Sequence, residues 1–226
     1  MRKLMVSILV LGILLVILDR VAVVGVQREI ARQIEAKYKL EATPTVTIEG
    51  IPFLTQALAG RYEEISIQIG GITQHGVKLS GIDATLNGVN APLMDLIQNA
   101  AAVDLRAERV TATIVISRET LDARAPRGIK VEGTGDALRV SGNLNVLGQQ
   151  VPVTADLKVE VNRGAVRLTP TNVKLAGGVP VPNANRLMTF TVPIGELPFN
   201  LRITSVRTTP EGLAVQGSAT DVPLRS

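Results

Sequence analysis

The stretch VPVTADLKVEV, residues 151–161, decides the fold class of this chain. Valine, alanine or leucine stands at every second position, with polar residues or proline between them. A period of two places successive side chains on opposite faces of a strand. The stretch therefore predicts an amphipathic strand with one apolar face and one solvent-exposed polar face, as in an antiparallel sheet.

Similar strands are predicted on both sides of it. Residues 138–146 precede it and residues 166–168 follow, across turns at Leu147-Gly-Gln149 and Asn162-Arg-Gly164, which predicts an antiparallel meander. In residues 77–86 the apolar residues stand at odd positions before Ser80-Gly81 and at even positions after it. A β-bulge would absorb this shift, and a glycine suits a bulge. Further alternating runs lie at residues 46–48, 65–69 and 110–116 and, beyond a Gly/Pro-rich loop at 176–185, at 190–194, 201–203 and 213–215.

Residues 20–39 predict a helix that ends before Thr43-Pro44. It is interpreted as lying on the sheet, or as a juxtamembrane helix that also touches lipid headgroups. Short helices are predicted at residues 92–102 and after Ser117, a candidate N-cap with Leu121 in the first turns. The fold class is therefore α+β, a long N-terminal helix packed on a curved antiparallel sheet. The apolar side chains that share one face of the long helix are Val23, Ile30, Ala31, Ile34 and Tyr38.

The N-terminus carries an aliphatic run behind Arg2 and Lys3. Residues 4–18 extend roughly 22 Å as a helix, which suits a signal peptide but falls short of the ~30 Å hydrocarbon core. Counted through Val26, past Asp19-Arg20, the run reaches roughly 34 Å and can span a membrane. We predict a signal anchor or a cleaved signal peptide in residues 1–26 and a β-rich domain in residues 27–226. Arg2 and Lys3 predict a cytoplasmic N-terminus, with the domain outside the cytoplasm, on the cell membrane or, after cleavage, in the periplasmic space.

Composition limits the classes of function. The net charge is +4, aromatic residues make up 2% of the chain, and there is no cysteine. Without tryptophan and with two Tyr and three Phe, the chain lacks a platform on which nucleic-acid bases could stack. The lack of cysteine excludes a disulfide framework and a thiol nucleophile.

A search for catalytic motifs identifies no active site. His75, the only histidine, lies in a predicted turn and is interpreted as a surface residue rather than a base. A zinc site lacks ligands, and neither a nucleophile elbow nor a P-loop is present. Residues 133–138, GTGDAL, resemble the start of a dinucleotide fingerprint but lack its third glycine. We predict a protein that is not an enzyme and needs no metal or cofactor.

Two apolar segments stand at predicted loops, and each carries a phenylalanine. They are Gly50-Ile-Pro-Phe-Leu54 and Gly195-Glu-Leu-Pro-Phe199. They are interpreted as loop anchors that plug the core, or as a lip that admits lipid and touches the membrane, because exposed apolar loops usually bind something.

Five short motifs resemble the LmeA-like family of bacterial envelope phospholipid-binding proteins. They are Asp19-Arg20, Arg28-Glu-Ile-Ala-Arg32, Ile48-Glu-Gly-Ile-Pro-Phe-Leu54, Leu197-Pro-Phe-Asn-Leu-Arg-Ile203 and Glu211-Gly-Leu-Ala-Val215. The resemblance implies a β-rich fold with a long helix, similar to tubular lipid-binding domains. It also implies binding of phospholipids such as phosphatidylinositol, and some members are implicated in building mannose-containing lipoglycans.

We therefore predict an extracytoplasmic, membrane-associated phospholipid-binding protein that supports envelope lipid or lipoglycan assembly and binds no nucleic acid. Hiding acyl chains from water is worth about 0.8 kcal/mol per CH₂, so such a protein needs a long aliphatic groove. The alternative is a structural protein that binds no lipid and recruits biosynthetic enzymes.

The predicted site places acyl chains between the long helix and inward-facing strand residues, under a lip of apolar loops. An arginine of the helix is expected near the phosphate of an anionic lipid, because its guanidinium offers a fork of donors. The competing interpretation is that these arginines only form the solvated side of the helix. The predicted lipid-binding residues are Arg28, Ile30, Arg32, Ile34, Phe53, Leu54, Phe190 and Phe199.

Overall fold

The computed structural model describes residues 2–74, 77–92, 105–134, 137–146, 149–162, 165–175, 186, 188–193 and 201–224. The chain divides into two compact units. Unit 1 comprises residues 1–70, 83–111 and 219–226, and unit 2 comprises residues 71–82 and 112–218. A long helix and antiparallel strands confirm the predicted α+β class.

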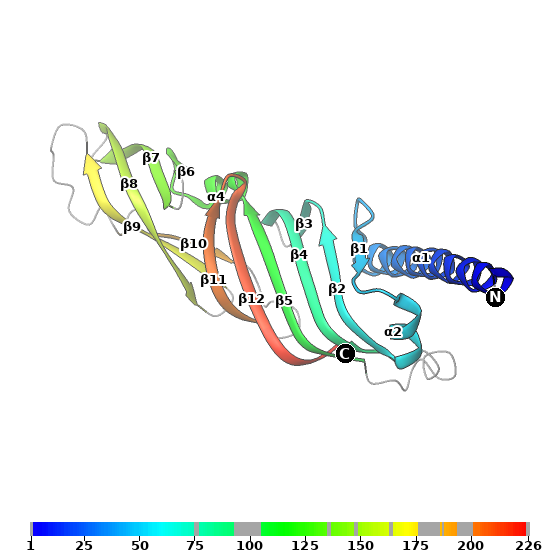
Figure 1. Ribbon diagram of the computed structural model, residues 1–226. Helices are drawn as coiled ribbons and strands as arrows, with labels where there is room; N and C mark the ends of the chain where they lie inside the picture. Colours follow the sequence, from blue (N-terminus) through cyan, green and yellow to red (C-terminus); the bar gives the residue numbers. More distant parts are fainter. Residues whose placement is uncertain are drawn as a thin grey trace. The chain divides into compact units, whose positions relative to one another are not determined.

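The helices and strands of the described residues follow the chain in the order labelled in Figure 1. The helices are α1 (Arg2–Tyr38), α2 (Phe53–Ala59) and α4 (Arg118–Arg124). The strands are β1 (Thr45–Ile48), β2 (Arg61–Ile69), β3 (Ile72–Gln74), β4 (Val77–Asn90), β5 (Arg106–Ser117), β6 (Ile129–Thr134), β7 (Ala137–Val146), β8 (Gln149–Asn162), β9 (Ala165–Leu175), β10 (Phe190–Pro193), β11 (Arg202–Thr209) and β12 (Gly212–Pro223).

Helix α1 is continuous through the aliphatic run and the amphipathic segment that follows it. Its 37 residues extend roughly 55 Å. No proline interrupts it, and Asp19-Arg20 does not break it. By length and composition it can cross a membrane, and residues 2–18 are all exposed. The predicted helix at 20–39 is thus the second half of a longer helix.

The buried face of α1 agrees with the predicted face in part, since Val23 and Ala31 were predicted there and Asp19 was not. Asp19, Val23 and Ala31 are its buried residues, and they follow each other at multiples of four. Ile30 and Ile34 are half-buried. The prediction that Tyr38 lies on the packed face is wrong, since its side chain is 57% exposed at the end of the helix. The reason is that α1 packs against α2 and β1 along the stripe through Asp19.

The described strands form two sheets. The seven-stranded sheet has the order β1-β2-β4-β5-β12-β11, with β3 paired to β4, and the five-stranded sheet has the order β10-β9-β8-β7-β6. In unit 1, β1 pairs antiparallel with β2, so that Val46 lies opposite Ile67. Strand β4 continues through Ser80 and Gly81 as one strand, and the bulge there stays a prediction.

Unit 2 contains the predicted meander. Strands β7, β8 and β9 pair antiparallel in sequence, and Val153 and Leu157 of β8 are buried while Thr154 and Lys158 are exposed. The alternation read from residues 151–161 is confirmed. The buried side chains form an almost purely aliphatic core, to which Phe190 contributes the aromatic ring.

Ser117 is confirmed as the N-cap of α4. Its hydroxyl accepts a hydrogen bond from the Thr120 N–H at 3.2 Å. Leu121, in the same helix, is fully buried in the core of unit 2. A serine hydroxyl satisfies one of the N–H groups that a helix start leaves without a partner.

Some predicted features lie outside the described residues: His75, the helix at 92–102 beyond its first residue, the loop at 176–185 and the segment 195–199 with Phe199.

Candidate functional site

An open cleft lies between α1 and β1 in unit 1. Its volume is about 370 Å³, at the lower end of the ~300–1,000 Å³ typical of small-molecule sites. Helix α1 contributes Val24, Gln27, Arg28, Ala31 and Arg32, and the chain before and in β1 contributes Thr43, Pro44, Thr45 and Val46. The cleft therefore combines an aliphatic wall with two arginines.

The two arginines differ in their surroundings. Arg32 forms an ion pair with Glu29 at 3.8 Å, one helical turn earlier, and both side chains are exposed. Arg28 is also exposed, and among the described residues it forms no ion pair or hydrogen bond. The guanidinium of Arg28 is thus available to an external anion.

The predicted site residues do not all gather at the cleft. Arg28 and Arg32 line it, whereas Ile30 and Ile34 do not, because Val24 and Ala31 form the helix wall instead. Phe190 is buried in the core of unit 2. Their predicted contacts with lipid stay predictions.

Phe53 is the first residue of α2 rather than part of a loop. It is 3% exposed, and its ring centroid lies 6.1 Å from that of Tyr62. Burial also raises the pKa of the Tyr62 hydroxyl. The position of Phe53 agrees with the interpretation of this segment as a core anchor.

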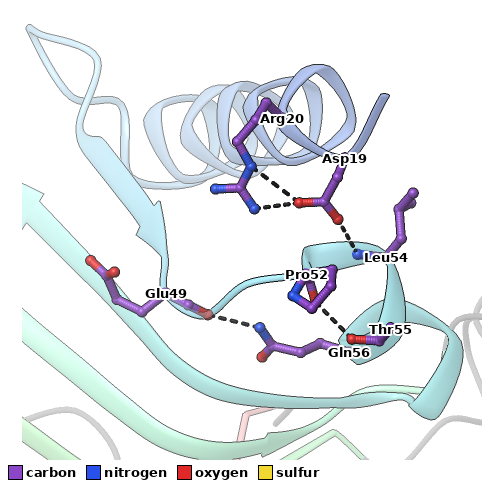
Figure 2. A network of polar contacts seen from close by, with 7 residues as sticks. All are labelled: Asp19, Arg20, Glu49, Pro52, Leu54, Thr55 and Gln56. Carbon is purple, nitrogen blue, oxygen red and sulfur yellow. Dashed lines mark hydrogen bonds and ion pairs between the residues drawn. The ribbon is translucent and has the colours of Figure 1, made fainter. Parts of the chain in front are cut away.

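A buried carboxylate joins α1 to α2, as Figure 2 shows. Asp19 is 4% exposed, and its Oδ1 accepts a hydrogen bond from the Leu54 N–H at 2.7 Å. Its Oδ2 accepts hydrogen bonds from the guanidinium of Arg20. Since Pro52, the N-cap of α2, provides no side-chain acceptor, Asp19 caps this helix from a distance in sequence.

The loop before α2 is held by two further polar side chains (Figure 2). The Thr55 hydroxyl donates to the Pro52 carbonyl at 2.8 Å, and the Gln56 amide donates to the Glu49 carbonyl at 2.9 Å. The Gln56 oxygen accepts from the Glu63 N–H at 2.9 Å. At the other end, Gly60 adopts φ 68°, the left-handed conformation that ends many helices.

We expect Asp19→Ala to loosen α2. Without the carboxylate, the Leu54 N–H loses its acceptor in a partly buried position, at a cost of about 1–3 kcal/mol. A helix of this length does not hold itself together without such contacts. Hydrogen–deuterium exchange of the peptide covering residues 50–60 should therefore accelerate roughly tenfold.

The matched control is Glu29→Ala, which removes an exposed carboxylate from the same helix. It should leave exchange at residues 50–60 unchanged. If this peptide exchanges as slowly in the Asp19→Ala chain as in the wild type, the carboxylate does not hold α2.

Two exposed aliphatic side chains near Asp19 were not predicted individually. Ile51 is 79% exposed and Leu58 is 82% exposed, at either end of the capped helix. Ile51 falls inside a segment that the sequence marks as apolar, whereas Leu58 carries no such signal because α2 is too short to show a helical period.

The cleft presents surfaces suited to binding. No group of three or more His, Asp or Glu side chains in the described parts of the chain is placed to hold a metal ion. The cleft offers aliphatic contact surface and arginine donors, which suits an amphiphile with an anionic headgroup.

Comparison with known proteins gives one family. A family model described as LmeA-like phospholipid-binding matches residues 17–218. No curated protein and no solved structure matches the chain. The matched region includes Asp19, the cleft, all of unit 2 and the part of unit 1 between residues 17 and 111.

Proposed function

Because the chain belongs to the LmeA-like phospholipid-binding family, we propose that it is a membrane-anchored phospholipid-binding protein of the bacterial envelope. The bound lipid lies in the cleft between α1 and β1, with an acyl chain along Val24, Ala31 and Val46. The observation that carries this proposal is an aliphatic cleft lined by arginines on the same helix that can enter a bilayer.

We propose that α1 stays attached as an anchor rather than being cleaved as a signal. Cleavage near Val23-Val-Gly25 would remove Asp19, which caps α2, and Val23, which is buried. The family match from residue 17 also includes this part of the helix. With Arg2 and Lys3 on the cytoplasmic side, unit 2 and the part of unit 1 beyond the membrane span lie outside the cytoplasm.

The position of the cleft along α1 favours an anionic phospholipid, with phosphatidylinositol as one candidate. A hydrocarbon core of ~30 Å takes about 20 residues of helix, so a span that begins at Leu4 ends near Val23. Arg28 then stands roughly 7 Å farther along the axis, at the level of lipid headgroups. A lipid whose chain enters the cleft beside Val24 can thus place its phosphate near Arg28.

We expect Arg28→Glu to reduce the preference for anionic lipid. The reversed charge repels the phosphate that the guanidinium attracts, and a hydrogen bond to a charged group contributes about 1.5–3 kcal/mol, or roughly tenfold to a hundredfold in affinity. The measurement is the ratio of phosphatidylinositol to phosphatidylcholine retained by the full chain from mixed micelles.

Lys37→Glu is the control, because it reverses a charge on the same helix beyond the cleft. It should keep the wild-type ratio. An unchanged ratio in Arg28→Glu would mean that this arginine belongs only to the solvated side of α1.

The proposed function is tested by native mass spectrometry of the full chain, purified in detergent and exchanged extensively into lipid-free micelles. We expect a phospholipid to remain bound in a fixed ratio after the loosely held lipid has been removed. A chain that retains none, and takes up none when phospholipid is added back, would contradict lipid binding. It would favour the alternative of an envelope scaffold that recruits biosynthetic enzymes.

The finer role, support of envelope lipid or lipoglycan assembly, follows from this binding. A protein that withdraws one acyl chain from the outer surface of the membrane presents the headgroup to enzymes outside the cytoplasm. No catalytic step by the protein itself is part of the proposal.

A further inference from the structure

The segment of residues 50–60, here called the tip segment, exposes aliphatic side chains on one face. Ile51, Thr55, Leu58 and Ala59 are exposed, whereas Phe53 and Ala57 are buried. Within α2, the exposed Thr55, Leu58 and Ala59 are three and four residues apart and share the outer face of the helix, while Ile51 precedes the helix. Two large aliphatic side chains about 80% exposed on so short a segment indicate a contact that lies outside the chain.

The tip segment also presents no charge. Residues 50–60, GIPFLTQALAG, contain no Asp, Glu, Lys or Arg, although 19% of the chain is charged. Its polar side chains are occupied within the protein, since Thr55 donates to Pro52 and Gln56 bonds to both Glu49 and Glu63. The outer face of α2 therefore reaches an apolar medium without leaving a charge or an unpaired side-chain amide there.

The hydrogen bond of Asp19 fixes the tip segment at one level along α1. Before Asp19, α1 has only exposed residues, and the 15 residues from Leu4 to Leu18 supply about 22 Å of helix. The ~30 Å hydrocarbon core needs about five residues more, and the exposed Val21 continues the apolar surface. The boundary of the hydrocarbon therefore falls between Asp19 and Val23, where Leu54 of α2 is bonded.

We infer that the tip segment rests in the outer surface of the bilayer that α1 crosses, with Ile51 and Leu58 inserted at the boundary between headgroups and acyl chains. This inference rests on the proposed anchoring by α1. The exposed apolar surface of α2 then continues that of α1, and the chain has two contacts with one leaflet. A second contact holds unit 1 at a fixed height, so the cleft beside Val24 opens at the membrane surface.

The natural absence of tryptophan allows a direct test with single-tryptophan reporters in the full chain. Leu58→Trp and Ile51→Trp report on the tip segment, Val10→Trp reports on the proposed span, and Tyr38→Trp reports on the exposed far end of α1. Each chain is reconstituted into phosphatidylcholine vesicles with and without brominated acyl chains. Circular dichroism spectra of the four proteins check that the fold is kept.

The expected result is a blue-shifted emission and a loss of intensity with brominated lipid for Val10→Trp, Ile51→Trp and Leu58→Trp. Tyr38→Trp should keep the emission of a tryptophan in water and lose no intensity. If Val10→Trp is quenched while both tip reporters behave like Tyr38→Trp, the inference is overturned and the apolar tip serves another partner, such as a protein. If Val10→Trp is not quenched either, the proposed anchoring fails, and the inference fails with it.

Discussion

Ala31→Trp should abolish the retention of phospholipid by the purified chain. Ala31 is buried in the wall of the cleft, so an indole at this position fills the space that an acyl chain would occupy. Displacing as few as three methylenes removes about 2 kcal/mol of binding, which is more than a tenfold loss of affinity. The measurement is the lipid-to-protein ratio by native mass spectrometry.

The control is the same change, alanine to tryptophan, on another face of the helix. Ala36→Trp places the same indole on an exposed position of α1, and it should retain lipid as the wild type does. Val24→Trp fills the cleft from a more exposed position and guards against a packing defect at Ala31. Wild-type lipid content in both folded cleft variants would rule out this cleft as the binding site.

Gly212→Ala should destabilise unit 2 by about 3 kcal/mol. Gly212 begins β12 with φ 147°, and an added Cβ would overlap the carbonyl oxygen of Ile116 and lie 3.0 Å from its carbon. The obstructing backbone cannot move easily, because Ile116 is fully buried and the Arg118 N–H is bonded to the Glu211 carbonyl at 3.1 Å. Differential scanning calorimetry should show a lower melting temperature, on the order of 10 °C.

Gly71→Ala is the matched comparison in the same unit. A Cβ there would meet the Leu79 carbonyl oxygen at an ordinary 3.5 Å. It should shift the melting temperature little. Similar shifts in the two variants would mean that the close approach at Gly212 is relieved by a local backbone movement.

Most of the strands were predictable because they carry their own period, whereas β3 and β6 were not predicted. The alternation in residues 151–161 needs no information from elsewhere in the chain, and it is the pattern of buried and exposed residues in β8. Ser117 was equally predictable as a cap, since its partner is three residues away.

The site was less predictable because distant contacts decide it. Helix α2 has seven residues and a proline N-cap, and its capping acceptor, Asp19, is 35 positions away. Ala31 lines the cleft, whereas Ile30 and Ile34 do not. Which side of α1 faces the cleft depends on where α2 and β1 pack against the helix. One signal for this contact was present, since an acidic residue inside an apolar helix usually has a specific partner.

The order of synthesis matters for unit 1, because its segments 1–70 and 83–111 are separated from its segment 219–226 by most of unit 2. Arg106 pairs with Asp221 at 2.5 Å and the Leu224 N–H bonds to the Leu105 carbonyl at 2.8 Å, so residues 219–224 close the unit. Between residue 111 and residue 219 all but a short part of unit 2 must be synthesised, which takes roughly 5–20 seconds at 5–20 residues per second. The meander of β6 to β9 pairs neighbours in sequence and can form during this interval. Strands β1, β2, β4 and β5 can pair with one another before this interval, whereas β12, the second neighbour of β5, is made only after it. Unit 1 is therefore the last to be completed, and the edge of β5 waits for its partner while unit 2 folds.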